Sequence, residues 1–239
     1  MGCYVKILYL CVSINMAVSI SIALNDGLYL RDPQTSDLGR RIIKHSILLI
    51  DALGFESFTF KKLAKEISST EASVYRYFEN KHLLLVYLVN WYWEWVQYLI
   101  EINTRNILEP RKKLKIVIQN IVHASLENPE VDYVNEAVLH RILVNEGSKA
   151  YHTTAVDREC KDGLFHPYEG LVGHVARIIG EIRPDFPYKK SLASNLFEMA
   201  NNQGFFAEHL SGLTDIKGRR NRDAAIQDMI EFFAMKLLS

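Results

Sequence analysis

Four helical segments in close succession, between residues 37 and 103, constrain the fold of this chain more than any other feature. Thr59, Thr70 and Asn80 each precede a helical pattern and are residue types that cap helix starts. Gly54 follows the first pattern, where a helix end favours a left-handed residue. Three short helices followed by one long helix predict an all-helical chain with a compact N-terminal head.

The second and third segments, residues 60–67 and 71–77, are separated by only three residues. This is the geometry of a helix-turn-helix, in which apolar residues pack between the helices and the later helix faces outward. The predicted packing residues are Leu63, Ala64, Ile67, Val74 and Phe78. Because the major groove of DNA is wide enough to admit a helix, the outward helix is a candidate for reading bases.

The same stretch resembles the TetR family of bacterial transcription regulators. Residues 54–67, GFESFTFKKLAKEI, are similar to the family's order of glycine, short turn, threonine, basic residue and Ile/Leu-Ala. Residues 73–78, SVYRYF, and 80–84, NKHLL, continue the resemblance at the expected spacing. The rest of the chain is similar to the family only in its length and helical pattern. An ordered set of motifs is more specific than any one of them.

The resemblance implies a homodimeric, ligand-responsive repressor or activator that binds a palindromic operator in double-stranded DNA. It implies a DNA-binding head at residues 36–96 and a body at 97–239 that binds an unknown small-molecule effector and forms the dimer. Residues 1–35 then form an N-terminal extension. The alternative is a helical small-molecule-binding or scaffold protein whose head does not bind DNA. An enzyme is a third class, but the sequence shows no catalytic set.

The resemblance also assigns individual residues by position. Thr59 and Lys81 are expected to bind phosphate, and Tyr75 to pack its ring and give its hydroxyl to phosphate. Residues expected at or near bases are Lys61, Glu71, Ala72, Ser73, Arg76 and Tyr77. The side-chain chemistry is compatible with these roles, because an arginine can donate two hydrogen bonds to guanine and a carboxylate can accept one from cytosine. Thr70 caps a helix start, whose free N–H groups suit phosphate.

The turn departs from the family pattern. The family has glycine followed by an apolar residue, whereas this chain has Ser68 and Ser69. If position 68 requires a positive φ, serine costs about 1 kcal/mol there relative to glycine.

The body is expected to contain helices at 110–126, 131–144, 148–161, 168–182, 188–210 and 219–238. The last two carry apolar faces that either pack within the chain or form a four-helix bundle across a two-fold axis. Phe206, Met229 and Phe233 are the expected dimer contacts. A pocket is expected between the long helix and the helices that begin at residues 110, 131 and 168.

The N-terminus is apolar from residue 7 to residue 24, but it contains several serines, which argue against a signal peptide or a membrane span. Alternation from residue 18, followed by Asn25-Asp26-Gly27, predicts a β-hairpin over 18–30. We expect translation to begin at Met16; a disordered tail or a membrane anchor are the alternatives. The predicted location is the cytoplasm, with no membrane contact.

Composition excludes several function classes. Lysine and arginine together number 28, as do aspartate and glutamate, so nucleic acid cannot be held by bulk charge. The three cysteines, Cys3, Cys11 and Cys160, have no paired spacing and predict neither a disulfide framework nor a zinc site. Glu136 and His140 lie one helical turn apart without a third ligand, so no metal is expected. No cofactor is expected either, because no P-loop or dinucleotide fingerprint is present.

Overall fold

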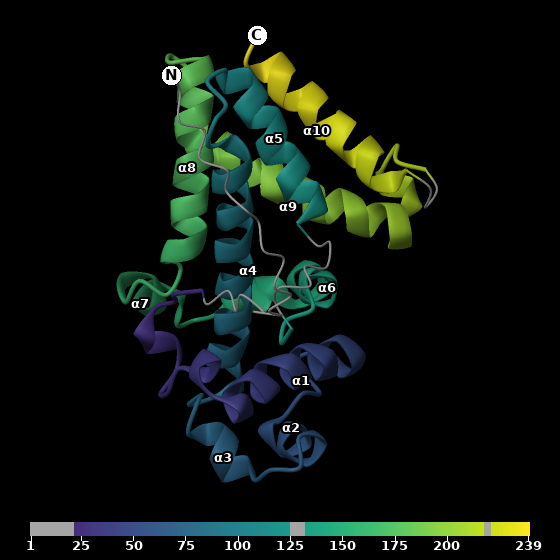
Figure 1. The fold of residues 1–239 in the computed structure, drawn as a ribbon. Coiled ribbons are helices and arrows are strands. Elements are labelled where there is room, and N and C mark those ends of the chain that lie inside the picture. The colour runs from purple at the N-terminus through teal and green to yellow at the C-terminus, as the bar shows by residue number, and fades with distance from the viewer. Residues whose placement is uncertain (1–21, 125–131, 218–220) are drawn as a thin grey trace, which may run out of the picture.

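The computed structural model describes residues 22–124, 132–217 and 221–239 of the chain. Within these residues all regular structure is helical, as predicted. Figure 1 shows a head formed by α1, α2 and α3 at one end and a larger helical body at the other, joined by the long helix α4. None of the described helices is both long and apolar enough to cross a membrane.

The head begins as the capping residues predict. It comprises α1 (Asp37–Leu53), α2 (Phe60–Glu66) and α3 (Glu71–Tyr75). The side chains of Thr59, Thr70 and Asn80 each accept a hydrogen bond from a backbone N–H in the first turn of the helix that follows. Gly54 ends α1 with a φ of 75°. The predicted packing residues between the helices, from Leu63 to Phe78, are all buried.

The helix α4 (Lys81–Thr104) belongs to both the head and the body. Its residues 84–93 are all buried, and this continuous burial places α4 inside the molecule rather than on its surface. The predicted boundary between head and body, at residues 96 and 97, falls within this helix.

The body surrounds the second half of α4. It comprises α5 (Pro110–His123), α6 (Glu136–Glu146), α7 (Val156–Lys161), α8 (His166–Ile182), α9 (Lys189–His209) and α10 (Arg222–Leu237). Four short 3-10 turns complete the described elements: Asp26–Leu28, Pro33–Thr35, Gly147–Ala150 and Ser211–Leu213. Figure 1 shows α6 directly beside α1, between the head and the upper body.

Aromatic side chains fill the interior along α4. Trp91 and Trp95 stack with their ring centres 6.1 Å apart. Trp93 stacks on Tyr168 of α8 at 4.6 Å and meets Phe197 of α9 edge-on. Buried aromatic rings contribute large apolar areas, so this cluster forms the centre of the body core.

The described part of the predicted hairpin, residues 22–30, forms no strand; residues 18–21 lie outside the described range, as does Met16. The Asn25 side chain accepts from the Gly27 N–H, and this bond bends the chain into a 3-10 turn. The backbone of Ile22 pairs with the side-chain amide of Gln34, at 2.7 and 3.0 Å, instead of with a second strand. Leu28 of this segment is fully buried, so the apolar pattern of the segment reflects packing on the helices.

Ser68 has a φ of 50°, as the comparison with the family's glycine anticipates. A residue with a side chain pays about 1–2 kcal/mol of backbone strain at positive φ, and glycine removes this strain. Glycine also has more conformational entropy in the unfolded state, which offsets part of the stabilisation. We therefore expect Ser68→Gly to raise the free energy of unfolding by about 0.5–1 kcal/mol, measured by urea denaturation. The control is Ser69→Gly, which changes a residue without positive φ and should not stabilise. Equal effects at both positions would contradict this account of the turn.

Candidate functional site

The outward surface of α2 and α3 brings together most of the predicted contact residues. Exposed on it are Thr59, Lys61, Thr70, Glu71, Ala72, Tyr75 and Arg76, with Ser73 half-buried among them. We call these eight residues the α3 face. The Tyr75 ring packs edge-on against Phe60 at 5.0 Å and still has 46% of its surface exposed. Its hydroxyl is therefore available to a partner while its ring is held in place.

Short polar contacts order the α3 face. The hydroxyl groups of Thr70 and Ser73 lie 2.8 Å apart, and an Arg76 guanidinium nitrogen donates to Ser73 Oγ at 3.3 Å. Thr70 also accepts from the Ser73 N–H at the helix start. This chain of contacts restricts the directions that the Arg76 side chain can take before any partner binds.

Tyr77 does not belong to this face. It is only 2% exposed, and its hydroxyl lies 2.8 Å from Ser36 Oγ at the start of α1. Arg31 sits over its ring at 5.4 Å. In this structure the Tyr77 ring is therefore packed within the protein and lies apart from the other residues predicted at the bases. Chain order alone could not show this, since Tyr77 follows the last turn of α3 and points back towards α1.

Lys81 is half-buried, and its ammonium is held by contacts within the protein. Its ammonium donates to the backbone carbonyls of Phe55, Glu56 and Phe58, at 3.0, 3.1 and 3.4 Å. It also lies 4.7 Å from the centre of the Phe55 ring. An ammonium has three N–H donors, and these contacts use all of them. In this structure Lys81 therefore holds the turn between α1 and α2, rather than presenting a charge to phosphate.

The segment before α1 connects the head to the body, which the sequence did not indicate. The Leu30 N–H donates to the Tyr77 carbonyl in the head, at 2.8 Å. On the body side, the Asn25 amide donates to the carbonyl of Asp162 at 3.1 Å. The Tyr133 hydroxyl donates to the Gln34 side chain at 2.9 Å. We call residues 22–36 the N-terminal strap.

A second connection joins α1 to α6. Arg141 donates to both carboxylate oxygens of Asp51, from Nε at 3.1 Å and from Nη2 at 2.8 Å. The Glu146 carboxylate accepts from the Phe55 N–H at 3.0 Å. The hydrogen bond to Asp51 raises the pKa of Arg141. A forked arginine–carboxylate pair fixes orientation as well as distance, so these contacts set how the head sits on α6.

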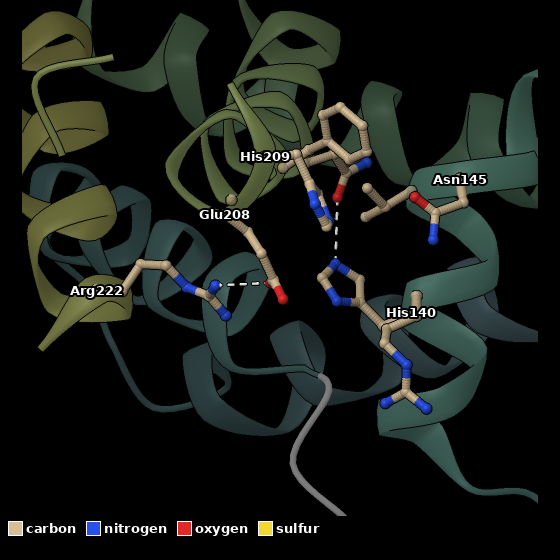
Figure 2. Close-up of a pocket in the computed structure, with 10 residues that line it drawn as sticks. His140, Asn145, Glu208, His209 and Arg222 are labelled. Carbon is tan, nitrogen blue, oxygen red and sulfur yellow. Dashed lines mark hydrogen bonds and ion pairs between the residues drawn. The ribbon is translucent and has the colours of Figure 1, made fainter. Parts of the chain in front are cut away.

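A pocket lies at the other side of α6, against α9 and the start of α10 (Figure 2). It has two adjoining parts. The outer hollow has a volume of about 130 Å³ and the inner hollow about 100 Å³, and both are lined by His140, Gly204 and Arg222. Figure 2 shows Arg222 and Glu208 facing each other across it, at 3.0 Å, and His140 reaching towards α9, where its Nε2 lies 3.3 Å from Asn201 Oδ1.

This pocket lies beside the predicted place rather than in it. It shares α5 and α6 with the prediction, but α9 and α10 form its other walls instead of α4 and α8. The side chains of Trp91, Trp93 and Trp95 are buried in the interior along α4, where the prediction placed a ligand. Sequence periodicity alone could not show which neighbouring space these rings leave open.

The helix α10 has two apolar sides. Ile226, Ile230 and Ala234 are buried against the rest of the body. On its other side, Phe232 and Phe233 are 59% and 45% exposed. An open groove of about 540 Å³ along α9 adds Tyr188, Leu192 and Met199 to the apolar surface near the end of α10. One side of α10 therefore packs within the chain, and the other is exposed in this single chain.

Comparison with solved structures shows that the arrangement of head and body is shared. AibR, in a complex with isovaleryl coenzyme A and operator DNA, has a TM-score of 0.56 at 14% identity over 81% of this chain and 97% of its own. The fatty acid degradation regulator FadR from Bacillus halodurans has a TM-score of 0.56 at 14% identity, over 83% and 93%. The superantigen PfiT has 0.55 at 12% identity, over 82% and 95%. No curated protein matches the sequence significantly.

The fold and the α3 face define a helix-turn-helix protein with a helical body. Residues 42–88, which run from α1 into α4, match the family described as "Bacterial regulatory proteins, tetR family". This match covers the head, and it confirms the resemblance that the motifs around the turn indicate.

The contacts of Lys81 yield a stability prediction. Lys81→Met leaves three backbone carbonyls without their charged donor, so we expect the free energy of unfolding to fall by about 1–3 kcal/mol. The control is Lys61→Met, which removes an exposed lysine from the same head. Thermal unfolding followed by circular dichroism compares the two, and an unchanged Lys81→Met variant would show that these contacts contribute nothing.

Burial lowers the pKa of His140, whose ring also stacks on Tyr92 at 5.6 Å. The unfolded imidazole has a pKa of about 6.5, so below that pH the unfolded chain takes up the proton more readily than the folded one. The free energy of unfolding should therefore fall as the pH drops through about 6.5, and His140→Gln should reduce that slope. Replacing the exposed His152 with Gln is the control. A slope unchanged in His140→Gln would contradict the assignment.

Proposed function

We propose that this protein is a cytoplasmic, ligand-responsive repressor that binds a palindromic DNA operator as a homodimer. The observation that carries the proposal is the ordered α3 face on a tetR-family head. The AibR structure contains both operator DNA and isovaleryl coenzyme A, which supports the combination of DNA and effector binding for this shared fold. In the proposal, residues 36–96 act as the DNA-binding domain and 97–239 as the effector and dimerisation domain.

The α3 face divides into two kinds of contact. Thr59, Thr70 and Tyr75 offer hydroxyl groups and helix starts that suit phosphate. Lys61, Glu71 and Arg76 carry the side chains that can reach base edges, with Ala72 and Ser73 close enough for smaller contacts. Tyr77 and Lys81 support the head from within and make no direct contact in this proposal. With zero formal net charge, the chain depends on this local surface for DNA affinity.

Dimerisation is proposed through the uncovered sides of α9 and α10. Phe232 and Phe233 expose large apolar surfaces that water does not favour. A two-fold pairing of these sides buries them and places two heads on one side of DNA, as a palindrome requires. Phe206 and Met229, which are half-buried, lie on the same two helices.

Binding selection from random duplex DNA tests the whole proposal. Enrichment of one palindrome, with half-sites about one helical turn apart, supports a dimer that places both α3 helices in the major groove. Failure to enrich any sequence from purified, folded protein would reject DNA recognition by this head.

Within the selected site, Arg76→Ala should weaken binding by about 1–3 kcal/mol and relax the preference at one base position. The reason is that a forked arginine contact with guanine is both strong and specific. Lys65→Ala, at an exposed lysine outside the α3 face, is the control. Gel-shift titrations on the selected site and on its single-base variants give the readout, and an unaltered preference in Arg76→Ala would place α3 in a different orientation.

Replacing both Met229 and Phe233 with lysine should yield monomers, because each interface would then bury like charges around the two-fold axis. Light scattering at micromolar concentration measures the mass. The control replaces Leu108, which is exposed in the loop before α5, with lysine. A dimer that survives the double change would place the interface on other helices.

A further inference from the structure

The pocket beside α6 combines apolar side chains from three helices with charged side chains of α6, α9 and α10. The inner hollow is lined by Ile121 and Val122 of α5, Ala200 of α9 and Ile226 of α10, and also by Asp223 in the first turn of α10. Arg222 lines both hollows, together with His140, so these two residues stand where the outer space meets the inner one. A molecule that fills both hollows therefore needs an apolar end and a polar end.

The arginines of the outer hollow already form ion pairs with carboxylates of the protein. Arg222 pairs with Glu208 at 3.0 Å, and Arg141, which lines the same hollow, pairs with Asp51. The Glu208 and Asp51 side chains are 40% and 28% exposed, so water can hydrate either one when it is released. An incoming carboxylate can thus exchange with a protein carboxylate without leaving a buried charge unpaired.

We propose that this pocket binds a short-chain carboxylate, with its carboxylate group between Arg141 and Arg222 and its hydrocarbon chain in the inner hollow. This inference rests on the proposed ligand response. It adds the chemical class of the ligand and the residues that couple ligand binding to the head. The volumes fit a small molecule, since a cavity of roughly 150 Å³ holds one benzene-sized guest. Asn201 and His140 supply neutral hydrogen-bonding groups beside the same space.

Arg141 connects this pocket to the head. On one side it lines the outer hollow, and on the other it holds Asp51 of α1 through two hydrogen bonds. A carboxylate bound to Arg141 competes with Asp51 for the same guanidinium. Occupancy of the pocket therefore weakens one of the contacts that orient the head on α6. By linkage, weakening the Asp51 contact must strengthen ligand binding by the same factor.

The first experiment uses butyrate as the probe, with butyramide and butylamine as isosteres of different charge. Titrations of the full-length protein are followed by NMR signals of the His140 ring. We expect butyrate to bind, butyramide to bind about tenfold more weakly and butylamine not to bind, because arginine favours an ionised acceptor. Absence of butyrate binding, or equal binding of the amide, overturns the proposed ligand class.

A steric variant tests the location. An added Cβ at Gly204 meets only Ile226 Cδ1, at 4.0 Å, so Gly204→Leu extends into the hollows without clashing with backbone. It should abolish butyrate binding and leave the helical circular dichroism unchanged. The matched control is Gly170→Leu, at an exposed helical glycine of α8 with nothing within 4 Å of an added Cβ. Undiminished binding in Gly204→Leu overturns the site.

A carboxylate-to-amide variant tests the connection to the head. Asp51→Asn should raise butyrate affinity by about threefold, because Arg141 is then held less strongly. In an Arg141→Gln background the same change should have no effect, since the shared guanidinium is gone. An affinity that does not respond to Asp51→Asn overturns the coupling.

DNA measurements separate this inference from the proposed function. If butyrate binds as expected but leaves affinity for the selected DNA site unchanged, the pocket stands and ligand control of DNA binding fails. If the protein selects a palindrome but does not bind butyrate, the proposed function stands and the ligand assignment fails.

Discussion

The burial of α4 on all sides is the constraint on which the rest of the structure depends. Residues 84–93 are buried without interruption, so no face of this stretch can be left to water. Tyr87 is covered by Phe78 of the head and by Tyr29 of the N-terminal strap, at 5.3 and 6.1 Å. The buried Asn90 amide donates to the Leu164 carbonyl of the body, at 2.6 Å. One helix thus forces head, strap and body to pack around it together.

Enclosure of α4 limits how the head can move. A displacement of the head must carry α4 along or break its packing, and well-packed interfaces change between discrete arrangements rather than bending continuously. Two sets of contacts between head and body stabilise the present arrangement. One is made by the N-terminal strap, and the other is the ion pair between Asp51 and Arg141. Because Arg141 of this pair also lines the pocket, α6 directly connects the pocket to α1 of the head.

The sequence was sufficient for features that depend on near neighbours along the chain. Capping by Thr59, Thr70 and Asn80 follows from a side chain and a backbone N–H three residues apart, and the family's glycine anticipates the positive φ of Ser68. The remaining features depend on distant partners. Leu28 lies in a segment with the sequence pattern of a hairpin, yet it is fully buried and its 3-10 turn contacts α4, more than fifty positions away. The pocket depends on which side chains fill the interior, and periodicity cannot decide that.

The inward placement of Tyr77 and Lys81 concentrates recognition on fewer residues. Both side chains are held by contacts within the protein, so under the proposed function the long polar side chains left to reach base edges are Lys61, Glu71 and Arg76. Arg76 is already restrained through Ser73 and Thr70, which lowers the entropy lost when it meets a base. Glu71 repels the phosphate backbone of every sequence alike and is compensated only where a base donates to it. A face built this way favours discrimination between sites over affinity for DNA in general, which is consistent with a chain whose formal charges balance.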